Sequence, residues 1–397
     1  MLPFVQVIPP PRTVPPLLTF RGCVPILNDA GFAPGGMHCR TRNPRDRTKE
    51  PRMSEDVLYT LVPAREPAAR WHGWMAHPSF GDPEGELDDA AAGRACVDHS
   101  MFGRIEVSGA DRIDLLHRLS TNALTHIVPG GAIPTVFVTD KGRIIDRVLV
   151  CATGPTLLLL TSPGAEAFLV EWIGKYTITE DIRFRIVTDA TVMVSLIGPE
   201  TVSSFCARTG SALPGQGSVV QAGRFTIARE SDGELAHVIA PKEDAPALTA
   251  AIAALAPGAR WIGFRAWEAY RIGRGIPARP GELSVDHNPL ECGLRGAVSF
   301  TKGCYIGQEV IARLDTYGKE RHVLALLSFR RPPGMPPPAP LAHGESPSGT
   351  LTSLSDVPRK GAFDALAVVL TSSAPPGASL RAGMSREEAT VRGYFGH

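Results

Sequence analysis

The sequence has no C-x-x-C pair. Its seven cysteines are scattered along 397 residues, at positions 23, 39, 96, 151, 206, 292 and 304. This spacing excludes a disulfide framework, a tight zinc site and a preformed four-cysteine iron–sulfur site. We therefore expect a protein of the reducing cytoplasm, for which any cluster would be transient or shared. The histidines form neither H-x-x-x-H nor H-E-x-x-H, so we assign no metal site.

Long hydrophobic runs and a charge of one sign are also missing. The longest apolar runs, such as 148–152 and 157–160, are far shorter than the ~20 residues that span a bilayer, so we expect no membrane segment. The formal net charge of +1 argues against a broad basic surface for direct binding of nucleic acid. Glycine-rich phosphate fingerprints are absent as well, which argues against a nucleotide enzyme.

The first 52 residues are rich in proline and arginine and show no sustained apolar period. Such a composition buries too little apolar surface to fold, so we expect residues 1–52 to be disordered. We also hypothesise that Met53 is the true start of the protein. A peptide of the native protein that maps upstream of Met53 would refute this.

Two later segments carry the spacing of mixed α and β structure. From 102 to 186 the pattern predicts the order strand, helix, strand, strand, helix, strand, which is roughly ferredoxin-like. A second unit of this kind is predicted between 192 and 255. Beyond a proline-rich link, short apolar pieces predict a small C-terminal β-barrel.

The most informative motif is the octet 302–309, which reads KGCYIGQE. Its two glycines permit positive φ angles or a close approach of the backbone to a ligand, although an arbitrary octet of this kind is more often a simple turn. Together with DHNPLECGL at 286–294 and ARLDTYGK at 312–319, it resembles the YgfZ-type folate-binding proteins, relatives of the T-protein of the glycine cleavage system. The octet matches the signature of that family at every position, whereas the T-protein itself usually lacks the cysteine and the Gln-Glu pair.

The resemblance implies an α+β fold with two ferredoxin-like domains and a C-terminal small β-barrel, arranged around a central hole that receives folate. The expected ligand is tetrahydrofolate or another reduced folate. The expected divisions are a disordered extension at 1–52, a first α+β folate-binding domain at 53–190, a second ferredoxin-like domain at 191–258, a helix and signature segment packing on the first domain at 259–328, a proline-rich linker at 329–341 and the barrel at 342–397.

Arg271 stands where the resemblance places a folate-binding arginine, and we expect it to bind the glutamate tail of the ligand. Taken alone, an arginine on a helix is usually a solvated surface residue. Arg274 is the alternative. The family usually has an acid at the position of Gly273, so the charge pairing here is open.

Asp146 is the candidate catalytic acid. It matches the first of two paired aspartates of the T-protein, and Arg147 replaces the second. In aminomethyl transfer such an acid would position or stabilise the attacked amine near folate N10. The alternative is an outward-facing strand acid that pairs with Arg147 or Arg143.

Further folate-binding candidates are Phe102, Asn122, Lys302 and Tyr305, which lie in the matched segments. Asn122 is equally suited to cap the C-terminus of a helix.

A carboxylate is also required for the pterin edge, and either Glu230 or Glu234 would supply it. Cys304 is the candidate reactive thiol, because Lys302 nearby favours the thiolate. We hypothesise that Cys304 touches a transient iron–sulfur intermediate or a partner thiol; the alternative is a small buried apolar group.

The resemblance implies a tetrahydrofolate-binding accessory protein for iron–sulfur cluster assembly, maintenance or repair, with an indirect effect on tRNA modification. Its partners would be iron–sulfur proteins or assembly factors, and we expect a monomer. One alternative is a tetrahydrofolate-dependent aminomethyltransferase or demethylase that uses Asp146. The other is a scaffold that has lost the ligand and only binds partners.

Overall fold

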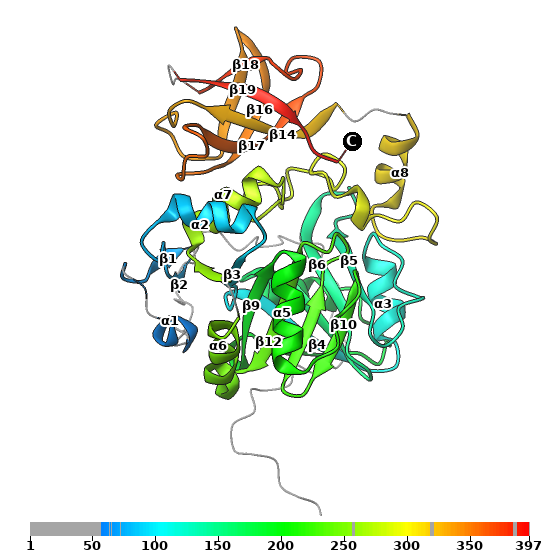
Figure 1. Cartoon of the computed structure of the whole chain (residues 1–397). Helices are drawn as coiled ribbons and strands as arrows, with labels where there is room; N and C mark the ends of the chain where they lie inside the picture. The colour runs from blue at the N-terminus through cyan, green and yellow to red at the C-terminus, as the bar shows by residue number, and fades with distance from the viewer. Residues whose placement is uncertain are drawn as a thin grey trace, which may run out of the picture.

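The computed structural model describes residues 57–396, apart from 63, 65, 72, 256–258, 318–320 and 384–386. The expected extension at 1–52 and the start at Met53 lie outside these residues. The described part has an antiparallel five-stranded sheet, a six-stranded sheet with one parallel strand pair, a two-stranded sheet, helices and a closed six-stranded barrel, which confirms the α+β fold class (Figure 1). Among the described residues no helix combines the length and the apolarity needed to cross a membrane.

The first sheet has five strands in the order β5-β6-β7-β4-β8. Their bounds are β4 (Phe102–Ser108), β5 (Ala132–Val138), β6 (Ile144–Ala152), β7 (Leu157–Pro163) and β8 (Arg183–Ile186), and helices α3 (Arg112–Leu119) and α4 (Glu166–Gly174) connect them. The order β8-β4-β7-β6 is the ferredoxin-like arrangement. β5 extends it at the edge, so this unit has one strand more than the predicted order.

The second sheet has six strands in the order β10-β11-β12-β9-β3-β13. Their bounds are β3 (Ala95–Asp98), β9 (Thr191–Ile197), β10 (Ser218–Ala222), β11 (Phe225–Arg229), β12 (Leu235–Pro241) and β13 (Arg260–Ile262), with helices α5 (Pro199–Thr209) and α6 (Ala245–Ala253). β3 belongs by sequence to the range expected for the first domain. It lies between β9 and β13, so the chain crosses from one sheet to the other. The domain boundaries themselves stay predictions.

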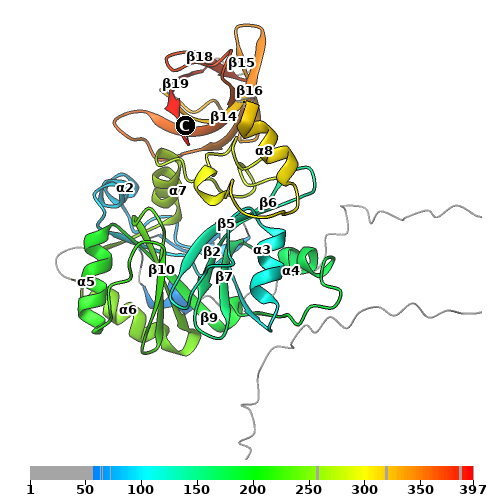
Figure 2. The ribbon, with the colours of Figure 1, turned by 90° about the vertical axis from the view of Figure 1, so that its right-hand side faces the viewer.

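The two sheets pack face to face, with α3 and α4 on the outside of one and α5 and α6 on the outside of the other (Figure 2). β6 shows how the sequence suits a strand that is covered on both faces. Val148 and Val150 pack toward the helix side of their sheet, while Leu149 and Cys151 enter the core between the sheets. Because successive side chains of a strand alternate, both faces of β6 are apolar where both are covered.

The barrel has the strand order β14-β17-β16-β15-β18-β19 and sits above α7 (Phe264–Gly273) and α2 (Pro83–Ala91) in Figure 1. Its strands are β14 (His322–Phe329), β15 (Ala339–His343), β16 (Ser346–Leu354), β17 (Phe363–Leu370), β18 (Ser379–Ala382) and β19 (Glu388–Tyr394). The proline-rich segment therefore connects two strands of the barrel, β14 and β15. The remaining elements are α1 (Val57–Leu61), β1 (Ala69–Trp71), β2 (Trp74–Ala76), α8 (Gln308–Tyr317) and the short 3-10 helices η1 (Thr188–Ala190), η2 (Lys242–Asp244) and η3 (Arg295–Ala297).

The two glycines of the octet 302–309 have different surroundings. Gly307 has a φ of 77°, and a Cβ there would lie 2.5 Å from the carbonyl oxygen of Thr139. A Cβ at Gly303 would meet nothing within 4 Å. The octet therefore needs glycine at Gly307, where it packs against the hairpin between β5 and β6.

We expect Gly307→Ala to lower the free energy of unfolding by about 1–3 kcal/mol, since alanine is strained at this backbone angle and its methyl group meets a fixed carbonyl. Gly303→Ala is the matched control and should change stability by less than about 0.5 kcal/mol. Urea unfolding of both variants measures the difference. Equal stabilities would contradict the packing described for Gly307.

Candidate functional site

A cavity of about 290 Å³ lies where the two sheets meet α7 and the segment that follows it. This volume is near the lower end of the ~300–1,000 Å³ typical of small-molecule sites. Apolar side chains from both sheets and three aromatic rings line it, namely Leu149, Leu160, Met193, Trp71, Phe102 and Trp267. Its wall also carries charged and hydrogen-bonding groups, so it combines a flat apolar space with a few polar contacts.

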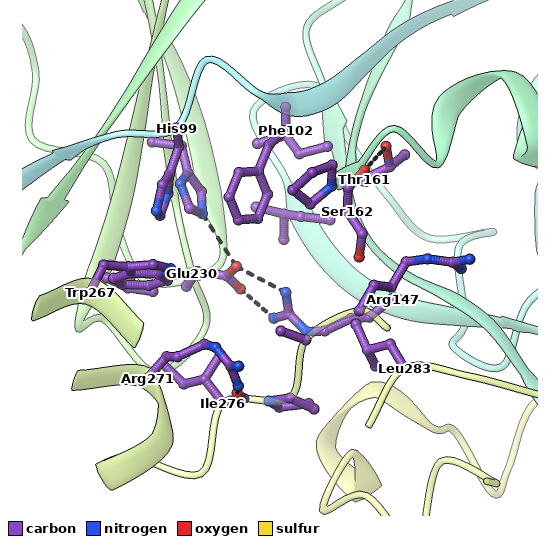
Figure 3. Close-up of a pocket in the computed structure, with 18 of the residues that line it drawn as sticks. His99, Phe102, Arg147, Thr161, Ser162, Glu230, Trp267, Arg271, Ile276 and Leu283 are labelled. Atoms are coloured by element: carbon purple, nitrogen blue, oxygen red, sulfur yellow. Dashed lines mark hydrogen bonds and ion pairs between the residues drawn. The ribbon is translucent and has the colours of Figure 1, made fainter. Parts of the chain in front are cut away.

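The central polar contact is an ion pair between Arg147 and Glu230 (Figure 3). Arg147 donates to Oε1 and Oε2 of Glu230 at 3.2 and 2.8 Å, and Nε2 of His237 lies 3.4 Å from Oε1. Burial alone would raise the pKa of Glu230, but Arg147 and His237 outweigh it and hold the pKa below its ordinary range. Glu230 is therefore a carboxylate inside the cavity.

The placement of Arg147 follows from strand periodicity. Arg147 lies two residues before Leu149, so both side chains point from β6 toward the space between the sheets. Sequence reasoning left Glu230 and Glu234 as equal candidates for the carboxylate at the pterin edge. Glu230 lines the cavity and is buried, whereas the side chain of Glu234 is 42% exposed and lies outside the lining.

Arg271 also lines the cavity, but its donors are already engaged. Its guanidinium bonds both carboxylate oxygens of Glu268 at 2.8 and 2.5 Å and the hydroxyl of Ser353 at 3.0 Å, and it faces Glu282 at 3.5 Å. Burial acts to lower the pKa of Arg271, and the two carboxylates outweigh it and raise the pKa. Arg271 thus ties α7 to the barrel strand β16.

Arg274 occupies the open side of the cavity. Its side chain is 52% exposed and lies 3.6 Å from Glu234. Because a surface ion pair of this kind is weak, the guanidinium can exchange partners with little loss. Of the two arginines expected to grip a folate tail, Arg274 is the one whose donors remain accessible.

Asp146 points away from the cavity and is not part of its lining. The side chain is fully buried, and its two oxygens accept hydrogen bonds from the hydroxyl of Ser162 at 2.6 Å and the backbone N–H of Ser162 at 3.0 Å. Burial raises its pKa to about 6, although the bonds from Ser162 and the charge of Arg279 oppose the rise. Ser162 lines the cavity and separates Asp146 from it.

We expect Asp146→Asn to stabilise the protein above pH 6 and to change stability little near pH 4. The pKa of Asp146 is raised from 3.8 to about 6 in the folded state, so native protein loses stability as pH rises through that window. The full effect is roughly 2–3 kcal/mol, at 1.36 kcal/mol per pKa unit. Asparagine keeps both contacts, because its amide accepts from the Ser162 N–H and donates to the hydroxyl.

Thermal unfolding of native protein and Asp146→Asn between pH 4 and pH 8 measures this difference. A difference that stays constant with pH would contradict a raised pKa for Asp146.

The remaining sequence candidates are divided between the cavity and other places. Phe102 lines the cavity, and its ring packs on the ring of His99 with centroids 4.4 Å apart. Asn122, Lys302 and Tyr305 are not in the lining. None of the residues of the octet 302–309 is in the lining, and Lys302 and Tyr305 make their contacts elsewhere.

Lys302 bonds the carbonyl oxygens of Ser120 and Asn122 at 2.7 and 2.9 Å and also that of His117, so it satisfies the open end of α3. Asn122 donates to the carbonyl of Pro134 at 2.8 Å. Tyr305 is buried in the core beneath the barrel.

Cys304 is exposed, and the four other cysteines of the described part are buried. Its side chain therefore faces solvent rather than a packed core. Within the described residues no three His, Cys, Asp or Glu side chains are placed to hold a metal ion.

Sequence reasoning missed His99, His237 and Trp267, which all line the cavity. His99 and His237 are joined through Ser195, whose hydroxyl lies 2.7 Å from Nδ1 of each ring. His99, Ser195 and His237 come from three different strands or strand ends and Trp267 from α7, so no local motif links them.

Residues 71–302, more than half of the chain, match the family model described as the GCVT N-terminal domain. The chain therefore belongs to this family. The crystal structure of the glycine cleavage system aminomethyltransferase T from Bartonella henselae has the same fold, with a TM-score of 0.72 at 18% identity over 86% of this chain and 96% of that one.

Two curated relatives are similar to this chain in sequence. The chain is 32% identical over 274 residues to an Arabidopsis thaliana protein named "Putative transferase, chloroplastic", and the match covers 64% of this chain and 60% of the relative. It is 25% identical over 276 residues to an aminomethyltransferase of Bacillus licheniformis, covering 64% of this chain and 73% of the relative. The chain thus matches less than two thirds of the length of the Arabidopsis protein.

Proposed function

We propose that this protein binds tetrahydrofolate, or another reduced folate, in the cavity between the two sheets. The observation that carries the proposal is the buried carboxylate of Glu230 in a cavity lined by aromatic rings, with a cation at its open side. Folate has three matching surfaces: a pterin edge with hydrogen-bond donors, flat rings, and an acidic tail. The residues present therefore fit this ligand.

Each surface of the ligand has a candidate partner. Glu230 would accept one hydrogen bond from the pterin edge, because a carboxylate has about four lone-pair sites and Arg147 and His237 occupy three. Trp267 and Phe102 would pack on the rings. Arg274 would bind the tail, as a guanidinium bonds a carboxylate through two N–H groups. A bound folate would supply a carrier for one-carbon units.

We further propose that the protein is a YgfZ-type accessory factor for iron–sulfur cluster assembly, maintenance or repair, with an indirect effect on tRNA modification. The KGCYIGQE octet and the exposure of Cys304 support this role. The position of Asp146 also supports it, because this acid is sealed behind Ser162 and cannot meet an amine in the cavity. Iron–sulfur proteins or their assembly factors would be the partners.

The second candidate is a folate-dependent aminomethyltransferase, the activity named for several relatives. A turnover assay with tetrahydrofolate and an amine donor separates the two. We expect tetrahydrofolate to bind without one-carbon transfer. Transfer that is lost in Asp146→Asn would establish the enzyme instead, and absence of folate binding would favour a scaffold that only binds partners.

Cys304 provides the test of the iron–sulfur role. Cells that lack the gene should lose resistance to oxidative stress, and Cys304→Ala should restore it only in part. Buried Cys151→Ala is the matched control, and any loss there should follow the amount of folded protein. Full rescue by Cys304→Ala would refute a role for this thiol.

A further inference from the structure

A chain of hydrogen bonds crosses three neighbouring strands of the six-stranded sheet and ends in the cavity wall. His237 on β12 lies directly opposite Ser195 on β9. Val97 on β3 lies opposite the same serine, and His99 follows two residues later on the same face. The hydroxyl of Ser195 therefore bridges Nδ1 of His99 and Nδ1 of His237, at 2.7 Å from each. At the other side of the His237 ring, Nε2 lies 3.4 Å from Oε1 of Glu230.

The hydroxyl of Ser195 has one proton, which restricts how this chain can be arranged. Glu230 is a carboxylate and can only accept, so Nε2 of His237 carries a proton. When His237 is neutral, its Nδ1 is bare and accepts from the Ser195 hydroxyl. The serine oxygen then accepts from Nδ1–H of His99, and Nε2 of His99 keeps a free lone pair.

The opposite arrangement requires a second proton on His237. Its Nδ1 then donates to Ser195, the hydroxyl donates to His99, and the proton of His99 moves to Nε2. Burial first, and His237 second, keep the pKa of His99 well below its ordinary value, so His99 itself stays neutral in both arrangements. The charged groups that line the cavity with these histidines are Arg147, Glu230, Asp232, Glu268, Arg271, Arg274 and Arg279.

Nε2 of His99 has no hydrogen-bond partner among the described residues. His99 is 1% exposed and lines the cavity, where its ring packs against Phe102 and Trp267 with centroids 4.4 Å from each. A buried polar atom without a partner is rare and unfavourable. Because His99 lines the cavity, a molecule bound there is a source for this missing partner.

We propose that His99 is a specificity-determining residue, whose Nε2 accepts a hydrogen bond from an N–H or O–H group of the bound ligand while the chain through Ser195, His237 and Glu230 holds it in the accepting tautomer. The ligand assignment rests on the proposed function, because a reduced pteridine carries N–H donors along its ring. A ligand that presents only a carbonyl at this point is disfavoured, since two lone pairs then face each other.

The tautomer of His99 is tested on the full chain without ligand, by NMR of ¹⁵N-labelled histidine at about pH 8, above the ordinary histidine pKa of ~6.5. We expect the Nδ1–H form for His99, whereas histidine in water favours Nε2–H. Ser195→Ala should return His99 to Nε2–H. Ser100→Ala removes a buried hydroxyl that bonds the backbone of Met193 and leaves the bond between Ser195 and His99 in place, so it should change nothing. An Nε2–H form in the native protein, or no effect of Ser195→Ala, would overturn the proposal.

Calorimetry with tetrahydrofolate tests the ligand contact. Ser195→Ala should weaken binding about 3- to 10-fold, the effect of one neutral hydrogen bond, and His99→Phe should weaken it at least as much. Ser100→Ala should bind as the native protein does. Native affinity in both Ser195→Ala and His99→Phe would overturn the contact. If native protein shows the expected tautomer but binds no tetrahydrofolate, the folate assignment is overturned while the hydrogen-bond chain stands.

Discussion

Arg271→Ala is expected to lower the free energy of unfolding by about 3–5 kcal/mol, the range for removing one partner of a buried ion pair. Glu282 is fully buried and would lose the guanidinium that faces it at 3.5 Å. The same carboxylate accepts hydrogen bonds from Thr352 and Ser353 of the barrel, so the loss would weaken the contact between α7 and the barrel. Urea unfolding followed by tryptophan fluorescence measures the change.

Arg274→Ala is the matched control, because it removes an arginine three residues away whose side chain is 52% exposed. Its effect on stability should stay within about 1 kcal/mol. A loss below 1 kcal/mol for Arg271→Ala as well would contradict the bracing role. If Arg271 joins α7 to the barrel, Arg271→Ala would weaken folate binding through partial unfolding as well as through loss of a contact with the ligand.

Glu230→Gln is expected to weaken tetrahydrofolate binding about 10- to 100-fold. A hydrogen bond to a charged group contributes about 1.5–3 kcal/mol, and each 1.4 kcal/mol is a factor of ten in affinity. Glutamine keeps the shape of the side chain but replaces one acceptor oxygen with an amide donor, which faces the donors of the pterin edge. Calorimetric titration of the folded variant measures the loss.

Glu234→Gln is the control for this experiment, since its side chain is 42% exposed and lies outside the cavity lining. Its affinity should match that of the native protein. Arg147→Gln combined with Glu230→Gln removes both charges and so separates the loss of the acceptor from an unpaired Arg147. Native affinity in Glu230→Gln would show that the pterin edge does not meet this carboxylate.

Strand periodicity predicted much of the fold, because alternating apolar residues in the sequence identify the strand faces that the sheets bury. The β5–β6 hairpin, the second α+β unit and the barrel follow from local alternation and turn residues. The insertion of β3 between β9 and β13 could not be predicted in this way. The residues of a short buried strand do not indicate which strands it pairs with, because those strands lie far away in sequence.

Residues of the candidate site were predictable only where a single residue could be recognised from its own position in the sequence. Phe102, Arg271 and Arg274 were expected at a cavity and line it. Alternation along β6 implies that Asp146 and Arg147 point to opposite faces, but only the packed sheets decide which face is the cavity.

The hydrogen-bond chain was invisible in the sequence, because Ser195 lies 96 residues from His99 and 42 residues from His237. Likewise, the partners of Arg271 include Ser353, which is 82 residues away.

The most direct measurement is a crystal structure of the full chain with tetrahydrofolate, grown without oxygen. The pteridine should lie between the two sheets, in contact with Glu230 and beside Trp267, with its tail toward Arg274. A folate bound at the octet 302–309, or a cavity that stays empty at saturating ligand, would contradict the account.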